Sequence, residues 1–206
     1  EGALKFARAA TQRKRVISLE SAFHGLSLGS LSLMGCESFT EGFGPLMEGF
    51  ETRIALDDLA TLERELAKRD VAAFVIEPVQ GKGCKSPATD FFERAQEVCR
   101  KQGTLLLCDE IQTGLGRTGK MFGFQHWKLE PDIITLAKSL SGGYVPCGAI
   151  VTRRDIYQKT FSRMDRCVVH STTFGRNNLA MACGLASLEV LDDEKLVENS
   201  AQMGAL

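Results

Sequence analysis

No run in the sequence approaches the roughly eighteen apolar residues that a membrane-spanning helix needs, and no signal-peptide pattern opens the chain. Basic residues are not in excess either, because 25 lysines and arginines stand against 26 aspartates and glutamates, which leaves a net charge of −1. A near-neutral chain offers no electrostatic footprint for nucleic acid or for an anionic membrane. We therefore expect a soluble protein without nucleic-acid or membrane partners.

Paired cysteine motifs are also missing. The seven cysteines form no C-x-x-C pair and no Cys/His cluster with the spacing of a zinc site, and Cys108 and Cys147 lie inside apolar runs. An odd number of scattered cysteines, some of them within apolar runs, favours reduced thiols over disulfides. These features predict a cytoplasmic protein with no metal site.

What the sequence does contain is an alternation of amphipathic and fully apolar segments. Short apolar runs predict buried strands, and segments with leucines at helical spacing predict helices. The alternation predicts a three-layer α/β fold with a mostly parallel sheet and helices on both faces. We expect strands at 15–19, 72–77, 104–108, 133–137 and 147–152, helices at 2–12, 56–68, 90–102, 155–161 and from 178 onward, and a loop over 36–54.

Two charged residues follow two of these strands directly. Asp109 ends the run at 104–108, and Lys138 ends the run at 133–137. Ligands in open α/β sheets bind outside the carboxyl ends of the strands, so both residues are candidates for one site.

A carboxylate and an amine at one sheet edge suit pyridoxal phosphate. Asp109 would keep the pyridine nitrogen protonated, and Lys138 would hold the aldehyde as a Schiff base. Opposite charges about 4 Å apart attract by roughly 4 kcal/mol at an effective dielectric near 20. A free lysine has a pKa of about 10.4, so the pocket must lower that value for Lys138 to act as a nucleophile.

Several motifs in this order resemble class III aminotransferases, the ornithine or ω-amino acid transaminase family. They are FHGLSLGSL, VIEPVQG, DEIQTGLGRTG, LAKSLSGG and HSTTFG, which together span almost the whole chain. The resemblance implies the large domain of a fold-type I pyridoxal-phosphate enzyme, which works as a homodimer. It makes Lys138 and Asp109 the catalytic residues.

The resemblance also implies roles for residues around the cofactor. Phe23 would stack on one face of the ring and Ile111 on the other, and Gln112 would approach the ring hydroxyl. Thr173 would reach across the dimer interface to the partner's cofactor phosphate. The implied cofactor site comprises Phe23, His24, Asp109, Ile111, Gln112, Lys138 and Thr173.

The residues themselves leave other roles open. Phe23 has the alternative of an ordinary core phenylalanine. Glu77 either touches the substrate or accepts backbone hydrogen bonds at the turn after its strand. Thr172 and Thr173 precede a predicted helix, so they form either an anion site or a helix cap.

A glycine motif offers a different interpretation of the chain. Gly114, Gly116 and Gly119 spell G-x-G-x-x-G, which alone suggests a nucleotide-binding oxidoreductase module. The Rossmann form of the motif stands at the strand end and opens a helix, whereas these glycines begin five residues after Asp109 and lead into MFGFQHW. We favour a flexible loop over the active site.

Three positions depart from the family pattern. Leu26 stands where many members have a cation, and Lys82 follows Gln-Gly where many have glutamate. We therefore expect a substrate with altered carboxylate requirements, such as a diamine, a β-amino compound or an acyl-chain aldehyde. Arg176 adds a cation without an assigned role.

The two ends resemble the interior of a longer protein. The chain opens on a helical pattern without an N-cap, after the place where the family has a phosphate-binding turn. We expect residues 1–190 to form a partial cofactor-binding large domain and 191–206 to begin the segment toward a small carboxyl-terminal domain.

These observations predict an aminotransferase that moves an amino group from an amine or ω-amino acid donor to a 2-oxo acid or aldehyde acceptor. Aminomutases and decarboxylases of the same fold share the lysine and the aspartate, so they remain alternatives. A catalytically silent, cut-down chain that acts only through a partner is a third.

Overall fold

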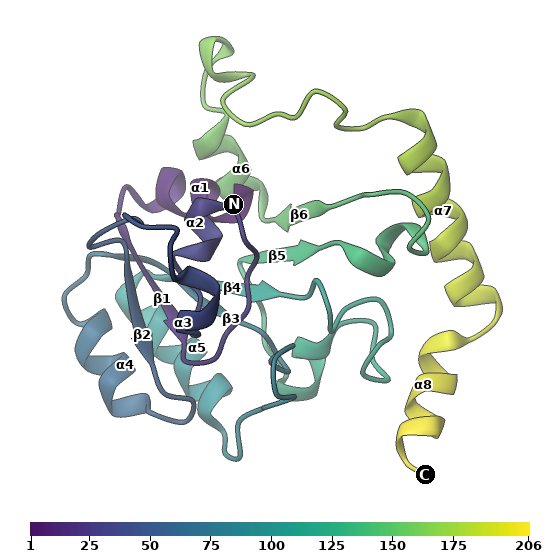
Figure 1. The fold of residues 1–206 in the computed structure, drawn as a ribbon, viewed down its shortest axis with the longest axis horizontal. Coiled ribbons are helices and arrows are strands. Elements are labelled where there is room, and N and C mark those ends of the chain that lie inside the picture. Colours follow the sequence, from purple (N-terminus) through teal and green to yellow (C-terminus); the bar gives the residue numbers. More distant parts are fainter.

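The computed structural model describes residues 1–206 and contains one six-stranded sheet. The strand order is β2-β1-β3-β4-β5-β6, with the first five strands parallel and β6 antiparallel to β5 (Figure 1). This confirms the mostly parallel α/β architecture. The strands are β1 (Arg15–Leu19), β2 (Glu51–Ile54), β3 (Val71–Ile76), β4 (Leu105–Asp109), β5 (Ile133–Leu136) and β6 (Ala149–Thr152).

The loop prediction for 36–54 is wrong at two places. Residues 37–40 form a single helical turn, α3, and β2 pairs in parallel with β1 at the sheet edge. β2 was missed because only Ile54 of its four residues is buried, so the strand has no apolar run. Edge strands have a solvated side and lack the signature of a central strand.

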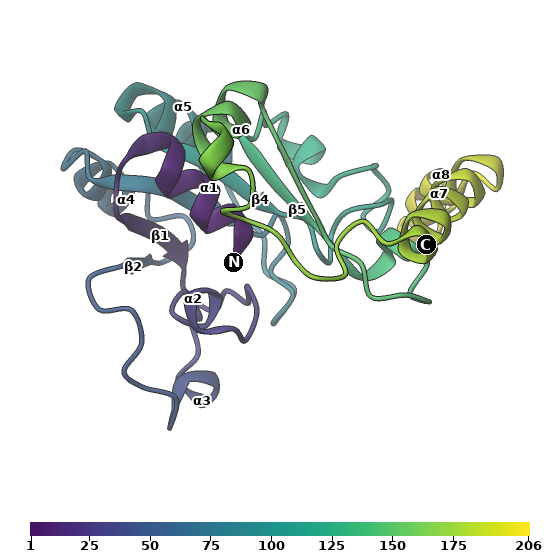
Figure 2. The ribbon, with the colours of Figure 1, turned by 90° about the horizontal axis from the view of Figure 1, so that it is seen from above.

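Helices cover both faces of the sheet. The helices are α1 (Gly2–Thr11), α2 (Leu28–Leu31), α3 (Glu37–Thr40), α4 (Leu59–Leu66), α5 (Phe91–Gln102), α6 (Arg154–Thr160), α7 (Asn178–Asp193) and α8 (Leu196–Gly204). One apolar cluster joins α4 and α5 to strand residues such as Phe74, and the other joins α1 and α6 to residues such as Val75. Successive side chains of β3 thus pack into the apolar clusters on opposite faces of the sheet, so helices, sheet and helices form three layers (Figure 2).

Local signals in the sequence account for the ends of these helices. Asp58 caps α4 by accepting a hydrogen bond from the Thr61 amide at 3.0 Å. Gly103 ends α5 in the left-handed conformation at φ 66°, which lets the chain turn at once into β4. The helix α5 therefore delivers β4, and with it Asp109, at a fixed register.

The last two helices lie beyond the sheet, on the side toward which β4 and β5 point (Figures 1 and 2). α7 packs on the short 3-10 turn Lys138–Ser141, and α8 packs on the glycine-rich loop. The predicted domain division at residue 190 falls inside α7 and stays a prediction. None of the helices combines the length and the apolar composition of a membrane-spanning segment.

Candidate active site

Asp109 is the last residue of β4, and its carboxylate is held on both oxygens. Oδ1 accepts hydrogen bonds from the Ile111 amide and the Thr135 hydroxyl, both at 3.1 Å. Oδ2 lies 2.9 Å from His24 Nδ1. The Asp109 residue is only 7% exposed, so the carboxylate is a fixed and largely dehydrated negative group at the carboxyl edge of the sheet.

Thr135 is a site residue that sequence reasoning missed. It lies in β5 directly opposite Asp109 in the parallel register of β4 and β5. Aligning the two strands at their predicted carboxyl ends would have paired Cys108 with Ala137, whereas the structure pairs Cys108 with Ile134 and so places Thr135 beside Asp109. Thr135 could therefore be found only from the register between β4 and β5, because a threonine in a strand is not by itself a site candidate.

His24 joins the segment after β1 to this carboxylate. Its imidazole is 4% exposed, and Nε2 is buried without a hydrogen-bond partner. An orphaned buried nitrogen costs free energy unless a further group satisfies it. His24 thus contacts Asp109 through Nδ1 and keeps Nε2 without a partner.

Lys138 follows β5 and begins a 3-10 turn at a positive φ of 44°. A lysine rarely adopts this left-handed backbone, and such strain concentrates at functional sites. Its ammonium donates a hydrogen bond to Gln112 Oε1 at 3.0 Å. Asp109 and Lys138 therefore lie at the ends of neighbouring strands without a direct bond between them.

Glu77 lies directly after β3, and its side chain binds the backbone of two segments. Both carboxylate oxygens accept backbone hydrogen bonds, Oε1 from Phe23 at 2.8 Å and Oε2 from Gly81 at 2.7 Å. Burial raises the pKa of Glu77, and the charge of His24 and the two amides oppose that rise. These hydrogen bonds are the ones that the backbone-holding role predicts, and a contact of Glu77 with substrate stays a prediction.

Phe23 is half-buried and packs edge-on against Phe39, with ring centroids 5.4 Å apart. It belongs to neither apolar cluster of the sheet, so the alternative of an ordinary core residue is wrong. The stacking role stays a prediction.

Glu110 lies next to Asp109 but faces a different set of groups. Its oxygens accept from the Thr113 hydroxyl at 2.6 Å and from the amides of Gly123 and Phe124 at 2.9 and 2.8 Å. With 1% exposure and every contact internal, Glu110 holds the loop after β4 in place. Of the two adjacent acids, only Asp109 contacts His24 and Thr135.

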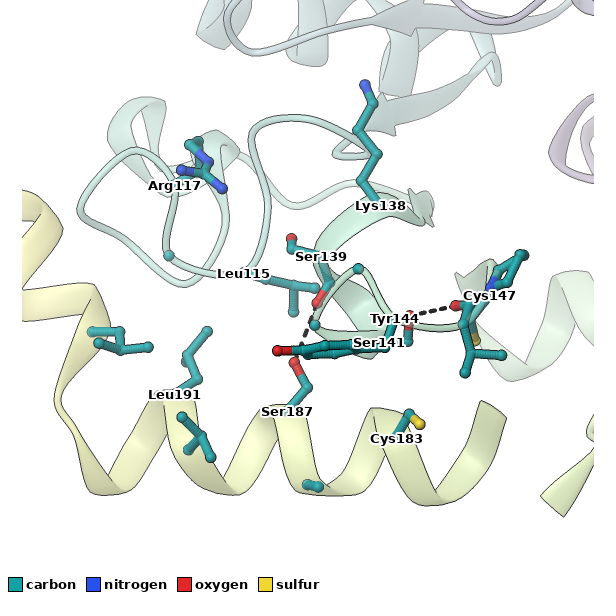
Figure 3. Close-up of a pocket in the computed structure, with 18 of the residues that line it drawn as sticks. Leu115, Arg117, Lys138, Ser139, Ser141, Tyr144, Cys147, Cys183, Ser187 and Leu191 are labelled. Carbon is teal, nitrogen blue, oxygen red and sulfur yellow. Dashed lines mark hydrogen bonds between the residues drawn. The ribbon is translucent and has the colours of Figure 1, made fainter. Parts of the chain in front are cut away.

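Two cavities border this region. The larger, of about 1210 Å³, lies between the turn after Lys138 and the helices α7 and α8, and it is lined by Tyr144, Cys147 and Ser187 among others. The Lys138 side chain points away from α7 (Figure 3). The smaller cavity, of about 660 Å³, is lined by Ile111 and Thr135, which also hold Asp109. Lys138 lines the larger cavity, whereas the smaller cavity shares Ile111 and Thr135 with the hydrogen bonds that hold Asp109.

Thr173 lies in an exposed turn before α7, away from any hydrogen-bond partner. Thr172 and Arg176 line the smaller cavity with Ile111. The cap of α7 is Asn177, which accepts from the Ala180 amide at 2.9 Å, so the threonine-cap alternative is wrong.

The glycine-rich loop does not open a helix. Gly116 and Gly119 adopt positive φ values of 87° and 79° in a series of turns, and a Cβ at Gly119 would lie 2.8 Å from Ala201 Cα. The glycines permit close packing of α8, and the context of a Rossmann motif is absent.

The family model described as "Aminotransferase class-III" matches residues 1–206. The chain belongs to the class III aminotransferases. Members of this family depend on pyridoxal phosphate, which is the cofactor that the sequence motifs predict.

Named relatives and solved structures agree with this class III assignment. Aminotransferase PigE from a Serratia species is 38% identical over 205 residues, which is 99% of this chain and 24% of the relative. An acetylornithine aminotransferase from Methanothermobacter thermautotrophicus is 39% identical over 206 residues, 100% of this chain and 51% of the relative. The ornithine aminotransferase of Toxoplasma gondii ME49 has a TM-score of 0.92 at 37% identity, covering 99% of this chain and 49% of that chain. The chain spans about half of the last two proteins and a quarter of the first.

Proposed function

We propose that this chain is the catalytic part of a pyridoxal-phosphate-dependent aminotransferase, which moves an amino group from an amine or ω-amino acid donor to a 2-oxo acid or aldehyde acceptor. The observation that carries the proposal is the placement of Asp109 and Lys138 at the carboxyl ends of the adjacent strands β4 and β5. One supplies a fixed anion and the other a primary amine.

The residues present fit the cofactor. Asp109 is a dehydrated carboxylate, the group needed beside a pyridine nitrogen that must stay protonated. The buried Nε2 of His24 has no protein partner, and a cavity of about 660 Å³ adjoins Ile111 and Thr135. When bound, pyridoxal phosphate supplies an electron sink for the carbon that loses its proton.

The chain's own residues would divide the remaining work. Lys138 would bind the cofactor aldehyde and then move the proton at the substrate carbon with its Nζ. Gln112 holds that nitrogen by accepting a hydrogen bond at 3.0 Å. His24, Thr135 and the Ile111 amide keep the Asp109 carboxylate oriented. Phe23 and Ile111 would enclose the ring from its two faces.

The substrate proposal rests on Leu26 and Lys82. Leu26 is 59% exposed, and Lys82 is exposed with its ammonium 4.7 Å from the Phe39 ring centroid. Neither offers the arrangement expected for an ornithine-like donor, so we propose a diamine, a β-amino compound or an acyl-chain aldehyde. A donor panel measured on the protein tests this, and a clear preference for ornithine would contradict it.

We also propose that the protein is a cytoplasmic homodimer in which Thr173 reaches the partner's cofactor. All seven cysteines are free, and α7 exposes apolar side chains such as Leu179 and Leu185, each 64% exposed. A solvated helix seldom presents so much apolar surface without a partner. Sedimentation should give a dimer that Leu185→Asp weakens, and a monomeric unsubstituted protein would refute the dimer.

A single reaction separates the aminotransferase from its alternatives. The protein, pyridoxal phosphate, an amine and a 2-oxo acid should yield the carbonyl form of the amine and the amino acid in equal amounts. An aminomutase would instead isomerise the amine without an acceptor, and a decarboxylase would release carbon dioxide. A silent chain, which we also keep as an alternative, would do none of these. Binding of NAD that persists in Lys138→Ala would favour the oxidoreductase.

A further inference from the structure

One buried carboxylate connects two segments that both reach the candidate site. Glu77 follows β3, is 6% exposed, and accepts from the amides of Phe23 and Gly81 on its separate oxygens. The two segments are also joined by Gln80, whose Nε2 donates to the Glu20 carbonyl at 2.8 Å. Two side chains, Glu77 and Gln80, therefore connect the turn after β1 to the turn after β3, and Glu77 is the ionisable one of the two.

The first segment leads to the carboxylate of the site. Phe23 carries the ring expected to stack on the cofactor, and the next residue, His24, contacts Asp109 at 2.9 Å. Holding the Phe23 amide in place consequently holds the imidazole on Asp109.

The second segment leads to the amine of the site. A Cβ placed on Gly81 would lie 3.1 Å from Gln112 Oε1, so this backbone packs directly on the Gln112 side chain. The same Gln112 oxygen accepts the hydrogen bond from Lys138 Nζ. The position of Gly81 thus limits where the lysine amine can be held.

We propose that Glu77 is a positioning residue, whose ionised carboxylate holds Phe23 and His24 on one side and Gly81 and Gln112 on the other in the geometry that the cofactor requires. This inference rests on the proposed aminotransferase function. It gives Glu77 a part in the reaction without contact to substrate.

The charge state of Glu77 is essential to this role. Two amide donors need two acceptor oxygens, and a protonated carboxyl or an amide in its place presents a donor to one of them. His24 and Asp109 are the titratable groups that face Glu77.

The test uses Glu77→Gln, which keeps the side-chain shape, and Glu77→Asp, which keeps the charge but is one methylene too short to reach both amides. Glu65→Gln is the control, because Glu65 is another buried carboxylate, paired with Arg15 at 2.7 Å near the amino ends of the strands. The first readout is amide exchange at Phe23 and Gly81 in the cofactor-free protein, measured by NMR. We expect exchange to rise on the order of tenfold at one of these two amides in Glu77→Gln, which presents a donor to it, and at one of them in Glu77→Asp, which does not reach both, with no change in Glu65→Gln.

The second readout is the induced circular dichroism of added pyridoxal phosphate, which reports the orientation of the bound ring. The proposal expects both Glu77 variants to change the sign or amplitude of this band per bound cofactor, while Glu65→Gln leaves it as in the unsubstituted protein. Faster exchange with an unaltered band would overturn the proposal and make Glu77 a purely structural residue. Unchanged exchange would overturn it as well. If the unsubstituted protein gives no cofactor band, the proposed function itself fails. Because the unsubstituted protein is measured first, this failure is distinguished from a failure of the Glu77 proposal.

Discussion

Adjacent acidic residues at the end of β4 serve different purposes because a strand turns successive side chains to opposite sides. Asp109 is directed to His24 and Thr135, and Glu110 is directed into the loop that follows. The pair was recognisable in the sequence, and Asp109 was selected from it because it directly follows the apolar run at 104–108. The loop-holding role of Glu110 was not predictable, because its amide donors lie more than ten residues further along the chain.

Removing the Glu110 carboxylate should destabilise the fold. Glu110→Ala leaves the buried amides of Gly123 and Phe124 without an acceptor, which should lower the free energy of unfolding by about 2–5 kcal/mol. Denaturant unfolding measures the change. The exposed Glu97→Ala should stay within about 0.5 kcal/mol of the unsubstituted protein. Equal stabilities of the two variants would contradict the assigned role.

The thiol of Cys36 should react at unusually low pH. Hydrogen bonds from Ser38 and from the Lys82 ammonium lower the pKa of Cys36 to about 7. The thiolate is the nucleophile, so alkylation by iodoacetamide should reach half its maximal rate near this pH. Ser38→Ala and Lys82→Gln should each move the midpoint upward, whereas Lys85→Gln should not. A midpoint unmoved by both substitutions would show that these contacts do not activate the thiol.

At the scale of elements, the sequence predicted the central strands and the longer helices with small errors at their ends. β3 and β4 are buried along nearly their whole length, and α5 has a glycine cap, so all three elements have clear signals in the sequence. β2 left none, because an edge strand with exposed residues lacks periodicity. The close approach of α8 to the glycine-rich loop depends on residues about eighty positions apart, which no local pattern encodes.

The inner face of α4 provides a test of the core. Leu62 is fully buried between α4 and the sheet, so Leu62→Ala should cost about 2–5 kcal/mol in the free energy of unfolding. Its exposed neighbour Glu63→Ala is the control and should change stability by less than about 0.5 kcal/mol. A Leu62→Ala loss as small as that of the control would mean that α4 does not pack as described.

Two glycines with similar backbone angles test the packing of α8. Gly119 and Gly143 have φ values of 79° and 83°, but only Gly119 would place a Cβ against Ala201. Both alanine variants should pay for the unfavourable φ, by about 1 kcal/mol. Gly119→Ala should in addition raise hydrogen exchange throughout α8, while Gly143→Ala should leave α8 protected. Equal protection of α8 in both variants would rule out the contact.

The whole molecule is a three-layer sandwich whose proposed catalytic groups lie at one edge of the sheet. The edge could be predicted, since Asp109 and Lys138 directly follow apolar runs. Their partners could be predicted in part: His24 and Gln112 came from the family resemblance, whereas Thr135 required the register between β4 and β5. The exposed apolar side chains of α7 lie outside the two cores, and the proposed homodimer would cover them.

The most direct test of the account is the visible absorption of the purified protein with added pyridoxal phosphate, compared with Lys138→Ala and with the nearby exposed control Lys120→Ala. We expect a yellow band in the unsubstituted protein and in Lys120→Ala, its absence in Lys138→Ala, and its bleaching by amines that serve as donors. A band that persists in Lys138→Ala, or that no amine bleaches, would contradict the claim that Lys138 is the catalytic amine of an aminotransferase.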